Sequence, residues 1–419
     1  SAFEALMVST ASRVGTGNIV GVANAIAIGG YGAVFWMWLI ALIGGATAFV
    51  ESTLAQIYKK RSVKGGSYGG PAYYIQAALG SRSLGIIFAV ALIATYAVGF
   101  NMLASFNLID SMSSYHFYDT LVTASGAHLL PIIGGALLAL LVGVCIFGNG
   151  NRIVKVTGVL VPVMGVLYII MALIVMVLNA GMLPEVLRRI FQGAFDFKAI
   201  FGGAAGFGSS ALMQGIKRGL YSNEAGVGSA PNAAAAADVS HPVKQGLVQM
   251  LSVFIDTILV CSATAMMCLC TGIEPSESLK GAPFVQASLE HTFGVVGPYF
   301  ITIALLLFAF TTLLGNLFYC EGCLNYIAGR TLSHRQMNVF HAFACVVVFV
   351  GAQMKFGLAW DIADVLMGIM ALINLPVILR LGGIAMHALS DYMKQRHEGK
   401  DPVFRAKNIG LKEQTDYWN

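Results

Sequence analysis

The feature that most constrains this chain is a series of apolar segments long enough to cross a lipid bilayer as helices. Ten such segments cover approximately residues 3–27, 32–58, 84–109, 129–147, 153–179, 190–221, 244–271, 297–327, 336–354 and 358–380. A helix needs about 20 apolar residues to span the hydrocarbon core. Only 11% of the 419 residues are charged, against about 25% in soluble domains. The sequence therefore predicts an all-α polytopic membrane protein whose surroundings are the lipid bilayer, and excludes a nucleic-acid-binding protein.

The basic residues are distributed unevenly between the segments that join these helices. If the N-terminus is cytoplasmic, nineteen of the 25 Lys and Arg residues lie in cytoplasmic segments and five in external ones, and Arg13 lies within the first span. Lys and Arg concentrate in the cytoplasmic loops of membrane proteins. We therefore expect both termini in the cytoplasm, with residues 385–419 as a cytoplasmic tail.

The reactive side chains do not suggest an enzyme. Most of the seven cysteines lie in apolar segments, and Cys320 and Cys323 have C-x-x-C spacing without a second pair. This pattern favours buried, reduced thiols over a metal or redox site. His and acidic residues form no constellation typical of a hydrolase or a metalloenzyme.

Two of the ten segments contain glycine clusters where a helix would otherwise continue. Gly15 and Gly17 lie in the first segment, and four glycines, Gly202, Gly203, Gly206 and Gly208, lie in the sixth. Each glycine weakens a helix by about 1 kcal/mol relative to Ala, so clusters predict unwinding. Glycines also allow close helix packing, but matched clusters beside polar residues favour breaks. Breaks in segments one and six predict two inverted five-helix repeats, residues 1–182 and 183–384, with a binding site at the midplane of the bilayer.

An unwound segment exposes backbone groups that bind ions and carboxylates. Amides near Thr16 and Gly17, at the start of the second half-helix, would favour a carboxylate. Carbonyls near Ala11 and Val14 would favour Na⁺. In the sixth segment, Gly206-Phe207-Gly208 would repeat this arrangement, with the phenyl ring covering an apolar part of the substrate. A zwitterionic amino acid matches these groups.

Other polar residues within the spans allow more than one interpretation. The adjacent hydroxyls of Thr311 and Thr312, taken alone, are typical of Thr side chains that bond to carbonyls of their own helix. Ionisable residues inside a membrane are functional candidates, and these are Arg13, Glu51, Asp256, Glu321, Asp361 and Asp364. Asp256 is the deepest acid. Pairing with Arg13, cation binding and proton transfer all remain open for it.

Several long motifs resemble those of the sodium:alanine/glycine symporter family. They include Val14-Gly15-Thr16-Gly17-Asn18-Ile19-Val20-Gly21, Gly69-Gly70-Pro71-Ala72-Tyr73-Tyr74, Ser222-Asn223-Glu224-Ala225-Gly226-Val227-Gly228-Ser229-Ala230-Pro231, Asp256-Thr257 and Phe310-Thr311-Thr312. The resemblance implies the leucine-transporter fold, with five-plus-five inverted repeats. It also implies Na⁺-coupled import of a small neutral amino acid, of the alanine and glycine class, across a bacterial or archaeal plasma membrane by alternating access. As in that family, we expect one further helix upstream of Ser1.

The resemblance also implies a set of site residues. The substrate-binding residues would be Val14, Thr16, Gly17, Asn18, Ala104, Gly206, Phe207, Gly208 and Asn316. One Na⁺ would be bound by carbonyls of Ala11, Val14 and Phe308 and by the hydroxyls of Thr311 and Thr312, and Asn18 would join a second Na⁺. Na⁺, the amino acid and the bilayer are then the expected partners, with no obligatory protein partner.

Two positions near the implied substrate site differ from the family pattern. Ala104 stands where the family usually has Gln, and Asn316 stands where it usually has Trp. The smaller residues and the amide of Asn316 predict a larger or more polar substrate, such as glutamine, asparagine or serine. The main alternative is a proton-coupled transporter that uses Asp256 or Glu321. A channel fits broken helices less well.

Overall fold

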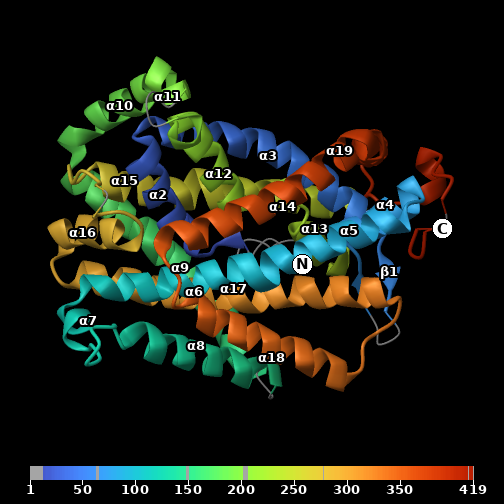
Figure 1. Cartoon of the computed structure of the whole chain (residues 1–419). Coiled ribbons are helices and arrows are strands. Elements are labelled where there is room, and N and C mark those ends of the chain that lie inside the picture. The colour runs from blue at the N-terminus through green and yellow to red at the C-terminus, as the bar shows by residue number, and fades with distance from the viewer. Residues whose placement is uncertain are drawn as a thin grey trace.

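The computed structural model describes residues 13–62, 66–147, 151–201, 206–276, 278–413 and 415–418, which are almost entirely helical (Figure 1). In a bilayer only helices and closed barrels satisfy their own backbone hydrogen bonds. The α-helices are α2 (Val20–Gly29), α3 (Gly32–Ile57), α4 (Pro71–Leu79), α5 (Arg82–Ile93), α6 (Asn101–Asp110), α7 (His116–Thr120), α8 (Leu130–Phe147), α9 (Asn151–Leu178), α10 (Leu183–Phe195), α11 (Phe197–Phe201), α12 (Ala211–Asn223), α13 (Ala230–Ala236), α14 (Pro242–Phe254), α15 (Ser262–Leu269), α16 (Ala282–Phe293), α17 (Val296–Ala328), α18 (His334–Gly351) and α19 (Phe356–His397). Strands β1 (Lys60–Arg61) and β2 (Ser67–Tyr68) form a small antiparallel hairpin.

Seven helical stretches of the described chain are long and apolar enough to cross a membrane. They are Gly32–Ile57, Arg82–Ser114, Leu130–Phe147, Val161–Leu178, Pro242–Leu269, Val296–Ala328 and Phe356–His397. Each coincides with an apolar segment predicted above, and α18 coincides with the predicted segment 336–354. The first predicted segment is described only from Arg13 onward, where α2 forms a short apolar helix.

The predicted sixth segment, residues 190–221, is not one continuous helix. It is divided between α10, α11 and α12. Helix α10 is amphipathic, because it buries Val186, Ile190 and Ala194 while Phe191 and Phe195 are about half exposed. The continuous helical part of this segment therefore begins at Ala211, and α10 lies along the surface of the bundle.

The last helix is also longer than predicted. Helix α19 continues without interruption through residue 385, where the sequence placed the start of the tail, and ends at His397. The remaining residues turn back and pack against the bundle beside β1 and α4 (Figure 1).

Two of the long helices contain a short π-helix. One, η2, covers Ala94–Phe100 between α5 and α6, and the other, η7, covers Ile255–Cys261 between α14 and α15. π-Helical turns within α-helices occur frequently at functional sites.

The glycines of α2 place it directly against α12. A Cβ on Gly29 would lie within 3.1 Å of Ala211, and one on Gly21 within 3.7 Å of Tyr221 at the opposite end of α12. The two helices are therefore antiparallel neighbours. The last residues of α2 and the first residues of α12 form what we call the outer ends of these helices. These outer ends point toward the end of the bundle that carries α7 and α16, which we call the α7 end (Figure 1). The opposite end, with the hairpin and the last residues, is the β1 end.

Candidate functional site

The first broken segment begins immediately before α2. Val14 and Gly15 are not helical, and Thr16–Asn18 form a single 3₁₀ turn, η1, in which every residue is buried. The Gly15 amide donates to the side-chain Oδ1 of Asn18 at 2.8 Å. A Cβ on Gly17 would lie 2.7 Å from the ring of Tyr221. Glycine is required here because the α12 side chain packs directly on the backbone. The non-helical residues Val14 and Gly15 lie where the sequence predicted a break, and the residues before Arg13 lie outside the described part of the chain.

A second broken segment lies between α12 and α13, at residues 224–229. Gly226 and Gly228 have φ angles of 79° and 96°, which favour glycine. Glu224, with φ of 55°, is the one non-glycine residue of the described chain with a positive φ. The Gly226 amide donates to Glu51 on α3 at 3.2 Å, so the loop is anchored to the bundle. Pro231 at the start of α13 then restarts the helix.

At Gly206-Phe207-Gly208, where the sequence placed the break, the chain leaves the α-helical conformation between α11 and α12, and Gly206 has a φ angle of 84°. The break at residues 224–229 lies one helix further along the chain. Gly206 and Gly208 are exposed and precede α12, and the Gly208 carbonyl accepts from Gln214 at 2.7 Å. They lie near the outer end of α2, and its ten residues correspond to about 15 Å of helix. The structure does not bring these two glycines to Thr16, and the side chain of Phe207 lies outside the described residues.

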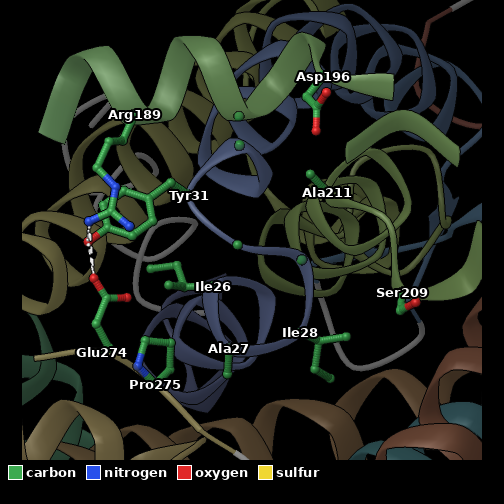
Figure 2. A pocket seen from close by; sticks show the side chains of 14 residues that line it. Ile26, Ala27, Ile28, Tyr31, Arg189, Asp196, Ser209, Ala211, Glu274 and Pro275 are labelled. Carbon is green, nitrogen blue, oxygen red and sulfur yellow. Dashed lines mark hydrogen bonds and ion pairs between the residues drawn. The ribbon is translucent and has the colours of Figure 1, made fainter. Parts of the chain in front are cut away.

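The outer ends of α2 and α12 instead border a cavity of about 510 Å³. Figure 2 shows Ser209 and Ala211 across this cavity from Arg189, Tyr31 and Glu274. Arg189 forms an ion pair with Glu274 at 3.0 Å, and both residues are substantially exposed. The cavity thus lies at the α7 end and is separate from the two breaks.

A buried hydrogen-bond network joins the two breaks. The Asn18 amide donates to Asp256 Oδ1 at 2.7 Å, and the Ser222 hydroxyl donates to Asp256 Oδ2 at 2.8 Å. Asp256 lies in the π-helix η7, which packs against η1. The Arg13 guanidinium donates to the Asn223 carbonyl and to Gln249. Arg13 therefore holds the end of α12, while Asp256 accepts from neutral donors at the break.

Aromatic side chains cover the network on the side of the α7 end. The ring centre of Tyr221 lies 4.8 Å from that of Phe100 and 5.1 Å from that of Trp360. The Arg218 guanidinium lies 4.3 Å from the ring of Trp360 and makes two hydrogen bonds to Asp364, at 2.9 and 2.6 Å. The sequence did not single out Tyr221, and the expectation for Phe207 concerns a side chain outside the described residues. The proximity of Tyr221 to Gly17 depends on the pairing of α2 with α12.

Three of the residues implied as Na⁺ ligands, Phe308, Thr311 and Thr312, lie on α17 opposite the first break. Thr312 Oγ1 lies 2.6 Å from the position that a Cβ on Gly15 would take. The Thr311 hydroxyl donates to the carbonyls of Leu307 and Phe308 at 3.0 and 3.1 Å, as expected for a Thr of a membrane helix. Backbone carbonyls and hydroxyls are oxygen ligands of the kind that Na⁺ takes. Ala11 lies outside the described residues.

Two asparagines mark the interface between α6 and α17. Asn316 donates to Asn101 Oδ1 at 2.9 Å, and Asn101 Nδ2 is buried without a hydrogen-bond partner among the described residues. On the same helix as Asn101, Ala104 is fully buried, and Asn107 donates to Thr16 Oγ1 at 3.1 Å. The first break is thus lined by α6 as well as by α12 and α17.

Two discontinuous helices that face each other around buried polar groups define a class of membrane protein, the secondary active transporter. Residues 1–406 match the sodium:alanine symporter family, and the chain belongs to this family of Na⁺-coupled amino acid transporters. It is 44% identical over 414 residues to the amino-acid carrier protein AlsT of Bacillus subtilis, covering 98% of this chain and 84% of AlsT. It is 43% identical over 404 residues to a B. subtilis protein named "Probable sodium/glutamine symporter GlnT", covering 96% of this chain and 81% of GlnT.

A solved structure supports the fold. The crystal structure of MhsT in complex with L-phenylalanine superposes with a TM-score of 0.61 at 17% identity, covering 89% of this chain and 88% of MhsT. This likeness establishes the leucine-transporter-like fold predicted from the sequence. Its membership of the sodium:alanine symporter family makes the protein a multi-pass membrane transporter and not an enzyme.

Proposed function

We propose that this protein imports a small neutral amino acid together with Na⁺, and that the two broken segments form the binding site. The observation that carries this proposal is the placement of η1 against the end of α12, where Gly17 contacts Tyr221 and Asn18 shares Asp256 with Ser222. This arrangement exposes backbone groups of two helices to one small, buried region. Alternating access would then follow from movement of these segments relative to the rest of the bundle.

The substrate carboxylate would bind at the amino end of α2. The backbone amides of Thr16 and Gly17 lie in η1, ahead of the ten-residue helix α2, whose positive dipole end favours an anion. Val14 and Asn18 complete this end of the site. Tyr221, with Phe100 and Trp360, would close over the substrate on the side of the α7 end. Gly206, Phe207 and Gly208 belong to the outer approach in this proposal.

Na⁺ would bind between the first break and α17. The carbonyls of Ala11, Val14 and Phe308 and the hydroxyls of Thr311 and Thr312 would supply its ligands. Asn18 would join a second Na⁺ beside Asp256, and the 2.7 Å hydrogen bond from the Asn18 amide to Asp256 Oδ1 supports this proposal. Binding that second ion would require the amide of Asn18 to turn its oxygen toward the cation.

The side chain of the substrate would face α6 and α17. The Nδ2 of Asn101, which has no hydrogen-bond partner in the described part of the chain, and the amide of Asn316 would offer hydrogen bonds, and the small side chain of Ala104 lies on the same helix as Asn101. A polar group on the substrate would satisfy the buried Asn101 donor, which is costly to leave unpaired. We therefore include glutamine, asparagine and serine with alanine and glycine as candidate substrates.

The β1 end would face the cytoplasm of a bacterial or archaeal cell. Lys59, Lys60, Arg61 and Lys244 lie there, together with the basic residues of the tail. This placement follows the concentration of Lys and Arg on the cytoplasmic side of membrane proteins.

Uptake into proteoliposomes tests the proposal directly. With an inward Na⁺ gradient, we expect saturable alanine uptake that glycine, serine, asparagine and glutamine each reduce. Competition by glycine and alanine alone would contradict the polar subsite and leave Na⁺ symport intact. Absence of Na⁺-driven uptake of every amino acid would contradict the proposed function itself.

Asp256 provides the alternative coupling mechanism. Its carboxylate is fully buried among Asn18, Ser222 and Thr257, and a buried acid in a transporter is a candidate proton carrier. Uptake driven by a pH gradient without Na⁺, and lost in Asp256→Asn, would support proton coupling. We expect no such uptake.

A further inference from the structure

The last residues of the chain form a folded segment on the β1 end, which we call the C-terminal clamp (residues 401–413 and 415–418). The Ala406 amide donates to the Trp418 carbonyl at 2.7 Å, and the rings of Phe404 and Trp418 lie 5.6 Å apart. Trp418 is 7% exposed and Phe404 is 2% exposed. The clamp is therefore packed onto the transporter and is not a solvated tail (Figure 1).

One side of the clamp binds the end of α3 and the hairpin. Trp418 Nε1 donates to the carbonyl of Gln56 at 2.8 Å, and the Tyr417 hydroxyl donates to the carbonyl of Gly66 at 2.6 Å. Asp416 forms an ion pair with Lys60 at 3.0 Å. The Lys59 ammonium lies 4.6 Å from the ring centre of Tyr417 and 5.0 Å from that of Trp418.

The other side of the clamp binds α14 and α19. The Phe404 amide donates to the Ser240 carbonyl at 2.9 Å, just before α14, and Lys244 pairs with Asp401 at 2.7 Å. On α19, Gln395 exchanges two hydrogen bonds with the backbone of Val403. The clamp thus connects helices that are distant in sequence.

The end of α3 and the hairpin, which contact the clamp, also form hydrogen bonds with the end of α13. The last carbonyls of a helix have no partner within it. In α13 these carbonyls accept from the α3 end and the hairpin: Ala234 and Ala237 from Gln56, Ala235 from Ser67, and Ala237 also from Lys59. Because α13 directly follows the second broken segment, the clamp is connected to the binding site through one short helix.

We propose that the C-terminal clamp keeps the β1 end of the transport path closed, and that its release controls opening toward that side. This inference rests on the proposed function, since an exit path from the breaks to the β1 end must open between the elements that the clamp joins. The polar contacts of the clamp suit reversible release. Lys60 and Asp416 are each 36% exposed, and exposed ion pairs are weak and screened by salt.

Hydrogen–deuterium exchange of the full chain in nanodiscs tests the clamp without relying on transport. Trp418→Ala removes the buried ring, and Asp416→Lys places a like charge beside Lys60 and Arg61. In both variants we expect several-fold faster exchange in α13 and in residues 66–68, and at least twofold higher maximal Na⁺-driven uptake. The matched control is Lys412→Ala, since Lys412 is an exposed residue of the same segment, and it should behave as wild type.

A rescue variant separates the clamp contact from general damage. The charge exchange Lys60→Asp with Asp416→Lys should restore slow exchange in α13. Faster exchange in the clamp, with exchange in α13 and maximal uptake both unchanged, would overturn the proposal. If Trp418→Ala does not fold, the exposed Asp416→Lys change provides the same comparison. A wild type that shows no Na⁺-driven uptake would overturn the proposed function while leaving the exchange comparison readable.

Discussion

At the residue scale, the site depends on Gly17, where any side chain would meet the ring of Tyr221. A Cβ there would lie 2.7 Å from two ring atoms. Overpacking costs about 1–3 kcal/mol, and about 1.4 kcal/mol corresponds to a tenfold change in an equilibrium constant. We expect Gly17→Ala to weaken substrate affinity about tenfold or more, as measured by substrate competition in proteoliposomes.

Gly208 provides the matched control for that substitution. A Cβ on Gly208 meets nothing within 4 Å, and the residue lies at the outer end of α12. Gly208→Ala should therefore leave substrate affinity close to that of the wild type. An equal loss of substrate affinity in the two variants would indicate that the Gly206–Gly208 segment is part of the binding site.

The two threonines of α17 differ in the partners of their hydroxyl groups. Thr311 donates to carbonyls of its own helix, whereas Thr312 faces Gly15. A hydrogen bond to a charged group contributes about 1.5–3 kcal/mol. We expect Thr312→Ala to raise the Na⁺ concentration for half-maximal uptake about tenfold, with the amount of folded protein unchanged and with recovery in Thr312→Ser. Unchanged Na⁺ activation in Thr312→Ala would exclude this residue from the ion site.

Single residues were predictable where their role depends on local sequence. The position of Gly15, Gly17 and Asn18 within an apolar segment was enough to predict the first break. The role of Tyr221 was not predictable in the same way. An aromatic residue inside a helix is usually part of the core, and only the antiparallel pairing of α2 with α12 places this ring on Gly17.

At the element scale, the ion pair between α12 and α19 connects a broken helix to a continuous one. Arg218 is 2% exposed and makes both hydrogen bonds to Asp364. Removing one partner of a buried pair costs about 3–5 kcal/mol because the other charge stays buried. We expect Asp364→Asn to lower the melting temperature in detergent by several degrees.

Asp361 is a suitable control because it is an exposed acid on the same helix. Asp361→Asn should melt close to the wild type. If the two variants melt at the same temperature, the Arg218–Asp364 pair does not stabilise the contact between α12 and α19.

The two broken elements show what sequence patterns can and cannot locate. Glycine clusters correctly indicated unwinding in the first segment. In the sixth, the prediction ended at Gly208 and did not include Gly226 and Gly228, whose positive φ angles and following Pro231 mark a further break after α12. The two glycines and the proline were visible in the sequence, but the apolar length of residues 190–221 suggested a membrane span that α10 does not form. A charged, amphipathic helix had been counted as part of a membrane crossing.

At the scale of the whole molecule, His241 connects the start of α14 to α19 and to the clamp. Its Nδ1 accepts the Val243 amide at 3.2 Å, and its Nε2 lies 3.3 Å from Asp391. Burial lowers the pKa of His241 to about 4, from about 6.5 in an unfolded chain. Between these values the unfolded chain binds more protons, so this residue contributes stability that is complete above about pH 6.5 and is lost as the pH falls toward 4.

We therefore expect thermal stability to decrease between pH 6.5 and 4, and His241→Asn to reduce that decrease. Asparagine keeps an oxygen that accepts at the start of a helix but does not titrate. The control is His387→Asn, an exposed histidine of α19, which should retain the wild-type dependence. Melting curves of the three proteins across this range provide the measurement.

Most of the architecture was predictable because the membrane restricts what a long apolar segment can do. Such a segment must be a helix of a certain length, and the spans of α3, α8 and α17 follow almost directly from the sequence. The C-terminal clamp followed from no such rule. Its composition is polar and basic, which is typical of a solvated tail. Its packing onto the bundle depends on two aromatic residues, Phe404 and Trp418.

The network between the two breaks has a consequence for synthesis of the chain. Asn18 and Asp256 are 238 residues apart, and Arg13 and Gln249 are 236 residues apart. At about 5–20 residues per second, the second member of each pair leaves the ribosome about 10–50 s after the first. During that interval Arg13 lacks Gln249 and Asn18 lacks Asp256, and unpaired polar groups are costly in hydrocarbon. The contacts that satisfy Arg13 and Asn18 in the first segment are therefore completed only after the second half of the chain has been made.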